Sequence, residues 1–124
     1  RVEPGPVSDR LRPCPGSPNC VCSEYPDDDH SIEPLTIAGS PDEAWDRLLR
    51  ILDEQPRTTI ISRSNEYLLA HVRTRVFRFL DELEFRLDRP GRMIHVRSAS
   101  RIGYSDLGTN RKRVEAIRKR FLEE

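Results

Sequence analysis

The chain contains 124 residues and carries no formal net charge, because 21 Lys and Arg residues balance 21 Asp and Glu residues. This length suits one domain that can bury a core without metal or disulfide support. The even charge gives no reason to expect a nucleic-acid or membrane partner, and no run of about 18 apolar residues is present that could span a bilayer. The composition therefore predicts a soluble globular domain.

The first 26 residues hold six of the ten prolines. Proline removes a backbone donor and biases the preceding residue away from helix, so this region is predicted to be extended and irregular. We expect residues 1–12 to form a flexible arm and residues 13–124 to form the folded domain.

The same region carries all three cysteines, Cys14, Cys20 and Cys22. A short loop rich in Pro and Gly can bring Cys14 and Cys20 within disulfide reach, which would leave Cys22 free. The alternative is a zinc site in which His30 is the fourth ligand, but this spacing differs from the usual paired motifs. We expect the disulfide and assign no metal.

A proline-interrupted strand and a helix are expected next. Residues 31–37 alternate loosely around a proline, which suits an edge strand because proline cannot donate to a central ladder. Ser40 as N-cap, with Glu43 three residues later, predicts a helix start. The apolar stripe of this helix, with Trp45 as a core residue, ends before Pro56.

Alternation with a period of two then replaces the helical pattern and predicts four strands. Their expected positions are residues 58–62, 66–74, 76–88 and 93–100.

One acidic residue interrupts the third of these strands. Asp81 falls among the apolar positions that include Phe77 and Phe79. Either the strand breaks near Asp81, or this carboxylate is buried and needs a partner. We favour the break, and we predict that Arg97 or Arg101 pairs with Asp81.

A second helix is predicted after Gly108, with Thr109 or Asn110 as its cap. The resulting order, β-α-β-β-β-β-α, predicts a two-layer α+β domain with an antiparallel curved sheet of about five strands and both helices on one face. This order resembles the TATA-binding-protein-like and helix-grip arrangements, in which a curved sheet cradles a long helix. Such an arrangement leaves room for a cavity between the sheet and the terminal helix.

Residues 97–113, with the sequence RSASRIGYSDLGTNRKR, form the candidate ligand-binding site. Glycines let the backbone turn so that amides converge, the helix start presents unpaired N–H groups, and arginines match carboxylate or phosphate. We therefore predict an anion-binding site, and the open alternative is that Asp106 fills it as an internal anion. The candidate residues are Arg97, Ser98, Ser100, Arg101, Gly103, Tyr104, Asp106, Gly108, Asn110, Arg111 and Arg113. Asp81 and Glu82 are assigned to an associated polar network.

Signals for catalysis are weak. A triad can be assembled from Ser98 or Ser105, His71 or His95, and Asp106, but the chain lacks a GxSxG elbow. It also lacks a phosphate loop and a dinucleotide fingerprint, so we assign no catalytic residue and no cofactor.

With these motifs in view, the chain resembles the uncharacterised family known as domain of unknown function 1499. The matching stretches are the cysteine segment from Cys14 to Cys20, FLDELEFR at residues 79–86, and RSASRIGYSDLG at residues 97–108 with the following Asn and Arg residues. The chain departs from the family pattern at Glu82, where Asp is usual, and at Cys22, where Ser is usual. The family brings no established activity.

The resemblance also bears on location. Members of this family are broadly bacterial, with plant plastid relatives, and often carry an export signal or a membrane anchor ahead of the domain. The resemblance therefore implies an exported or membrane-anchored protein in an oxidising compartment, which favours the Cys14–Cys20 disulfide.

Three functional hypotheses follow. We favour a non-enzymatic binding or scaffolding domain of the envelope that accepts an anionic small molecule, a lipid headgroup or the carboxylate of an envelope protein. The second hypothesis is a structural module whose Arg and Asp residues form a buried network that fixes the fold. The third is an enzyme that uses Asp81, Glu82 or Asp106 as acid or base.

Overall fold

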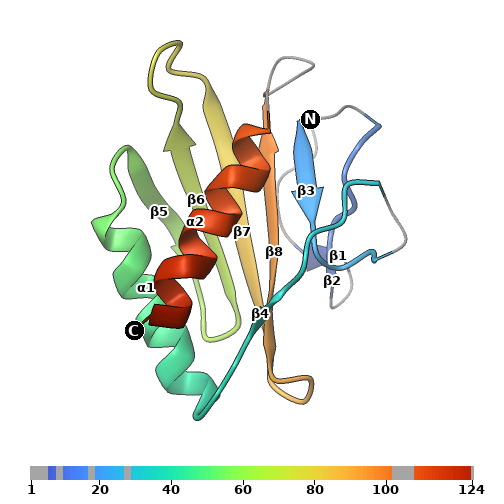
Figure 1. The fold of residues 1–124 in the computed structure, drawn as a ribbon, viewed down its shortest axis with the longest axis vertical. Helices are drawn as coiled ribbons and strands as arrows, with labels where there is room; N and C mark the ends of the chain where they lie inside the picture. The colour runs from blue at the N-terminus through green and yellow to red at the C-terminus, as the bar shows by residue number, and fades with distance from the viewer. Residues whose placement is uncertain (1–5, 8–9, 17–18, 27–28, 102–107, 124) are drawn as a thin grey trace.

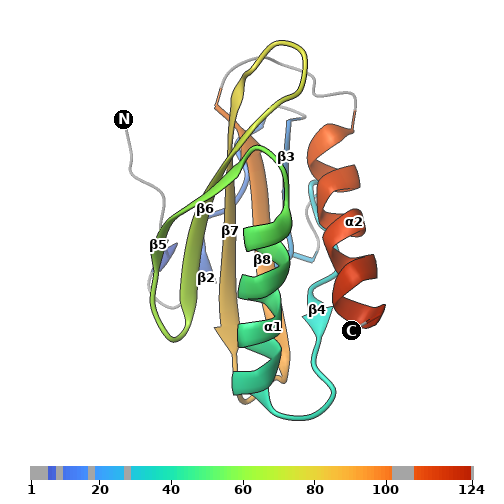
Figure 2. The same ribbon diagram turned by 90° about the vertical axis from the view of Figure 1, so that its left-hand side faces the viewer.

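The computed structural model shows an α+β domain in which one antiparallel sheet carries two helices on the same face (Figures 1 and 2). The structure describes residues 6–7, 10–16, 19–26, 29–101 and 108–123. Its strands are β1 (Pro6–Val7), β2 (Arg10–Leu11), β3 (Cys20–Cys22), β4 (Leu35–Thr36), β5 (Thr58–Arg63), β6 (Tyr67–Arg73), β7 (Leu80–Asp88) and β8 (Met93–Ser100). Its helices are α1 (Pro41–Glu54) and α2 (Thr109–Glu123).

Strands β5 to β8 form a meander of consecutive antiparallel hairpins. The order in the main sheet is β3-β8-β7-β6-β5, and β4 pairs with the other half of β8. The predicted fold class and the four central strands are confirmed. The sequence prediction missed β3, which lies in the region assigned to irregular structure, and the edge strand expected at residues 31–37 is reduced to β4.

Local sequence explains where the two helices begin. Ser40 caps α1 by accepting a hydrogen bond from the Glu43 amide at 3.3 Å, as the capping box predicts, and Trp45 is buried. In α2 the Gly108 carbonyl accepts the first helical hydrogen bond, from Lys112. Asn110 lies inside this helix and is fully buried, so it does not act as the cap.

Strand β7 is buried on both of its faces. Leu83 and Phe85 point into the core beneath the helices, while Glu82 and Glu84 point to the opposite face and are also buried. The strand starts at Leu80 after a turn and runs past Asp81 without a register shift, so the favoured break near Asp81 is wrong and the alternative, a buried Asp81 within the strand, is confirmed.

This start moves two aromatic residues out of the core. Phe77 and Phe79 lie in or beside the turn and are 74% and 40% exposed, so their predicted place among buried positions is wrong. Asp81, by contrast, has no exposed surface.

Residues 10–16, which we call the N-terminal segment, cover the face of the sheet opposite the helices (Figure 2). Leu11, which we assigned to the flexible arm, is fully buried. The Leu11 amide donates to the Glu24 carboxylate at 3.1 Å, and Glu24 also accepts from Arg86 of β7. Strand β2 therefore belongs to the packed structure, two residues before the expected domain boundary.

We predict that Leu11→Ala lowers the free energy of unfolding by about 2–4 kcal/mol, because it removes a fully buried side chain. Urea denaturation measures the change. Leu122→Ala is the matched control, since Leu122 is 63% exposed and should change stability by about 0.5 kcal/mol or less. Equal effects of the two substitutions would show that β2 is not packed as described.

Candidate functional site

Five polar side chains join the start of α2 to β7 and β8. We call Asp81, Ser98, Ser100, Asn110 and Arg113 the helix-start cluster. Asn110 Oδ1 accepts from Ser98 Oγ at 2.6 Å and from Arg113 Nη1 at 2.8 Å, and Asn110 Nδ2 donates to Ser100 Oγ at 3.0 Å. Arg113 Nη2 donates to Asp81 Oδ2 at 2.8 Å. The cluster fixes α2 against the sheet through hydrogen bonds between buried or nearly buried groups.

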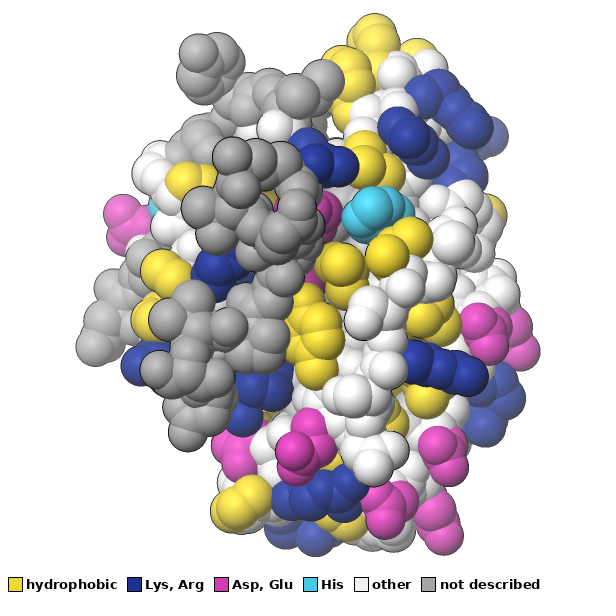
Figure 3. Space-filling view, turned by 180° about the vertical axis from the view of Figure 1, so that it is seen from behind, with side chains coloured by type: hydrophobic (Ala, Val, Ile, Leu, Met, Phe, Trp, Pro, Cys, Tyr) yellow, Lys and Arg dark blue, Asp and Glu magenta, His cyan; other side chains and the backbone are white. Residues whose placement is uncertain are grey.

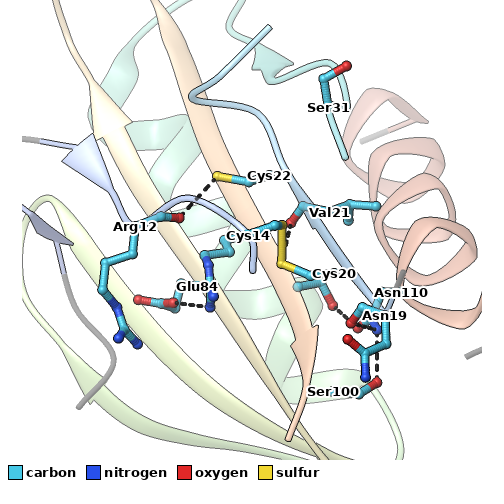
Figure 4. The surroundings of a disulfide bond; sticks show 12 residues. Arg12, Cys14, Asn19, Cys20, Val21, Cys22, Ser31, Glu84, Ser100 and Asn110 are labelled. Carbon is cyan, nitrogen blue, oxygen red and sulfur yellow. Dashed lines mark hydrogen bonds and ion pairs between the residues drawn. A yellow bond between two sulfur atoms is a disulfide. The ribbon is translucent and has the colours of Figure 1, made fainter. Parts of the chain in front are cut away.

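The segment that carries the disulfide contacts this cluster through Asn19 (Figure 4). Cys14 and Cys20 are bonded, as predicted, and Cys22 is free and buried. The Asn19 carbonyl, next to the disulfide, accepts from Asn110 Nδ2 at 3.0 Å and from the Ser100 amide at 2.9 Å. The covalent loop thus presents a carbonyl to both α2 and β8.

Cys22 lies on the face of the sheet opposite the helices, with its Sγ 3.6 Å from the Arg12 carbonyl (Figure 4). Burial raises the pKa of its thiol to about 11. The thiol therefore stays protonated at neutral pH and is a poor nucleophile.

The predicted partner of Asp81 was wrong, because Arg113 pairs with it instead of Arg97 or Arg101. The reason is strand alternation. Asp81 faces the helices, whereas Arg97 faces the opposite side of β8 and pairs with Glu84 at 3.3 Å. Arg101 lies 3.9 Å from Glu82, which also belongs to that opposite side of the sheet.

The structure brings together only part of the predicted anion site. Ser98, Ser100, Asn110 and Arg113 converge in the helix-start cluster. Arg97 and Arg101 lie on the opposite face of the sheet, and Arg111 is exposed and donates to the Ser31 carbonyl at 3.0 Å. The expected convergence of arginine forks is therefore absent among the described residues. Gly103, Tyr104 and Asp106 lie outside the described residues.

The side chains considered for catalysis are separated as well. Ser98 faces α2, whereas His95 faces the opposite side of β8, where its Nδ1 lies 2.9 Å from Ser23 Oγ. Asp81 and Glu82 also point to opposite faces of β7. No pairing of Ser98 with His95 is therefore available.

Beneath the N-terminal segment lies a second group of buried charges. Glu84 has no exposed surface and accepts from Tyr67 Oη at 2.6 Å and from Arg97. Burial raises the pKa of Tyr67, and the hydrogen bond to Glu84 acts in the same direction. Burial lowers the pKa of His95 even though the nearby Glu24 carboxylate opposes that shift. The contacts of Glu84 join β6, β7 and β8 to one another, whereas Glu24 links the Leu11 amide to His95 of β8.

A pocket of about 620 Å³ opens beside the helix-start cluster, between α2, the end of α1 and the turn that joins β6 to β7. Its volume is in the range of pockets that hold small molecules. The apolar side chains that line it are Leu52, Pro56, Val72, Val76, Phe77, Phe79, Leu83 and Ile117. Asp81, Ser100 and Arg113 are the members of the helix-start cluster in its lining.

The charged lining of the pocket is mainly basic. Its cationic side chains are Arg57, Arg73, Arg75, Lys112 and Arg113. Among the described residues that line it, Asp81 is the single acid, and Arg113 neutralises it. Arg57 and Arg73 donate to the backbone carbonyls of Arg73 and Arg78, which leaves their positive charge uncompensated in these contacts. The pocket therefore combines apolar walls with an excess of positive charge.

Of this lining, the sequence predicted Ser100 and Arg113 as ligand-binding residues and Asp81 as part of the polar network, and it missed the rest. The signal was present in the segment TRVFRF at residues 74–79, where arginine alternates with large hydrophobic residues. We interpreted that alternation as a buried strand, which assigned its hydrophobic residues to the core.

We predict that Arg113→Ala lowers the free energy of unfolding by about 3–5 kcal/mol, because it leaves the buried Asp81 carboxylate without its cation. Oδ1 of Asp81 already lacks a hydrogen-bond partner among the described residues, so nothing nearby replaces the lost contact. Thermal or urea denaturation measures the loss. Arg111→Ala on the same helix removes an exposed arginine and should cost about 1 kcal/mol or less. Similar losses for both variants would argue against a buried pair.

A further prediction concerns pH. The pKa of His95 is lowered on folding, so the unfolded chain takes up a proton more readily than the folded one. Stability should fall as the pH drops below the ordinary histidine value of about 6.5. Urea denaturation between about pH 7.5 and pH 5 should show a shallower fall for His95→Gln than for the wild type. An identical pH dependence would contradict a neutral, buried His95.

The chain matches a known protein family. The sequence profile of the family described as "Protein of unknown function (DUF1499)" matches residues 10–121. No curated protein matches the chain. In the described part of the chain, neither helix combines the length and the hydrophobicity that crossing a bilayer requires.

Proposed function

Since the chain belongs to the DUF1499 family of proteins of unknown function, we propose a function from its own geometry: the domain binds an amphipathic anion in the pocket beside α2. The observation that carries this proposal is the joint lining of the pocket by apolar and cationic side chains. The apolar part of the ligand would lie against Leu52, Val72 and Ile117, and its anionic group would lie near the basic side chains.

Lys112 supports the position of the anionic group. It is exposed in the first turn of α2 and belongs to the pocket lining. The N-terminal end of a helix favours negative charge, which adds to the attraction of Lys112. Arg57, Arg73 and Arg75 line the pocket from the turn before β5, from β6 and from the turn after β6. An anion there would contact positive charge from both sides.

The proposed anion lies in the pocket, whereas the sequence prediction placed it among the polar residues at the start of α2. The helix-start cluster uses its polar groups on one another, so Ser98 and Asn110 serve to fix α2. The pocket beside this cluster supplies the open volume and the uncompensated charge. A purely structural role thus describes the cluster, and a binding role describes the neighbouring pocket.

Isothermal titration with decanoate, decanol and decyltrimethylammonium tests the proposal. We expect saturable binding of decanoate, with affinity at least about fivefold higher than that of the neutral or cationic chain, because only decanoate pairs an apolar body with negative charge. Thr58→Trp should weaken binding of all three probes, since Thr58 lines the pocket and a larger side chain would fill it.

Lys112→Glu and Lys119→Glu form the matched pair for the charge. Both lysines are exposed on α2, but only Lys112 lines the pocket. We expect Lys112→Glu to weaken decanoate about fivefold and Lys119→Glu to leave it nearly unchanged, since attraction between exposed charges falls off within a Debye length. No saturable decanoate binding, or equal loss in both variants, would refute the proposal.

A further inference from the structure

The turn between β6 and β7 exposes a cluster of hydrophobic side chains. Val76, Phe77 and Phe79 are 78%, 74% and 40% exposed, and the two aromatic rings stack with their centroids 5.4 Å apart. We call residues 74–79 the tip. Among the described residues, the other exposed large hydrophobic side chains are Ile61 and Leu122, which lie outside the tip. The tip extends past the N-terminal end of α2 at the top of the molecule (Figures 1 and 2).

Hydrogen bonds hold this turn in shape. The Thr74 amide donates to the Phe79 carbonyl at 2.8 Å, and the Phe79 amide donates to Thr74 Oγ1 at 2.8 Å. Arg73 Nη1 donates to the Arg78 carbonyl at 3.2 Å. The exposed side chains therefore belong to an ordered turn whose backbone polar groups are partly satisfied.

The tip and the residues that flank it are strongly basic. Residues 73–80, RTRVFRFL, contain Arg73, Arg75 and Arg78 and no acidic residue. Arg57 of the neighbouring chain segment donates to the Arg73 carbonyl, which adds a fourth guanidinium at the same end. Figure 3 shows hydrophobic side chains at the top of the molecule beside Lys and Arg side chains, with acidic side chains gathered lower down.

We propose that the tip docks on a lipid bilayer that contains anionic lipids. Val76 and Phe77 enter the interface between headgroups and acyl chains, and Arg75 and Arg78 contact lipid phosphates. The charge argues against pairing with a second copy of this chain, because that would bring the arginines of two tips together. The projecting shape of the tip also suits insertion between headgroups.

The substrate class that docking implies rests on the proposed function. Arg75, Val76, Phe77 and Phe79 belong to both the tip and the pocket lining. A tip in the headgroup layer therefore places the pocket opening next to the bilayer, where amphipathic anions are abundant. The expected substrate class is a lipid-derived anion taken up from the membrane surface.

Co-sedimentation with large vesicles tests the docking. We expect the wild-type protein to bind vesicles of phosphatidylcholine with about 30% phosphatidylglycerol, with weaker binding to pure phosphatidylcholine and at higher salt. Phe77→Ser and Arg78→Glu should each lower the vesicle partition coefficient at least about fivefold. Ile61→Ser is the matched control, because Ile61 is 50% exposed on β5, and it should bind like the wild type.

Three outcomes would overturn the docking proposal. The first is absence of binding to the anionic vesicles, and the second is equal binding by Phe77→Ser and the wild type. The third is tip-dependent self-association in sedimentation equilibrium without vesicle binding, which would assign the tip to a second copy of the chain.

Arg78→Glu separates the two proposals. Arg78 belongs to the tip and is not in the pocket lining, so this variant should keep its affinity for the uncharged decanol while it loses vesicle binding. Lys112→Glu should show the opposite pattern, with weaker decanoate binding and unchanged vesicle binding. If the wild-type protein binds vesicles but does not bind decanoate, the pocket function is refuted and the docking of the tip stands.

Discussion

The ion pair between Asp81 and Arg113 is the interaction on which the rest of the arrangement depends. It places a carboxylate at the start of β7 and a guanidinium in the second turn of α2, both largely shielded from water. Such a pair is costly to bury, and it holds only when other hydrogen bonds occupy the remaining donors. Arg113 meets this condition through Ser98 and Asn110, so the pair sets how α2 lies across the sheet and where the neighbouring pocket opens.

Much of the fold could be predicted from local patterns. The N-cap at Ser40 and the alternation in β5, β6 and β8 are signals that lie within a few residues, and the structure agrees with them. Strand β3 could not be found in this way, because three residues between a disulfide loop and an irregular segment carry no period. Its pairing with β8 depends on residues far away in the sequence.

The errors at the site have a related cause. Alternation in residues 76–88 was correct for β7 but was extended into the tip, so the hydrophobic residues of the tip were assigned to the core. Arg97 was expected to face Asp81, although cross-strand register places their side chains on opposite faces of the sheet. A net charge of zero likewise hides the basic end of the molecule, because acids elsewhere balance its arginines. The sequence pattern predicts whether an element is a helix or a strand. Which side chains share a face of the sheet, and which residues they contact, follows from tertiary packing.

The disulfide loop has a consequence for the order in which the chain folds. Asn19 and Asn110 are 91 residues apart, so their hydrogen bond closes a long loop and carries a large entropic cost. Cys14 and Cys20 are separated by only six residues and can meet early, before distant segments have come together. Once the bond has formed, the Asn19 carbonyl has fewer conformations to search, and α2 arrives at a partner that is already in place. A bond between two nearby cysteines thus lowers the entropic cost of a contact whose partners lie 91 residues apart in the chain.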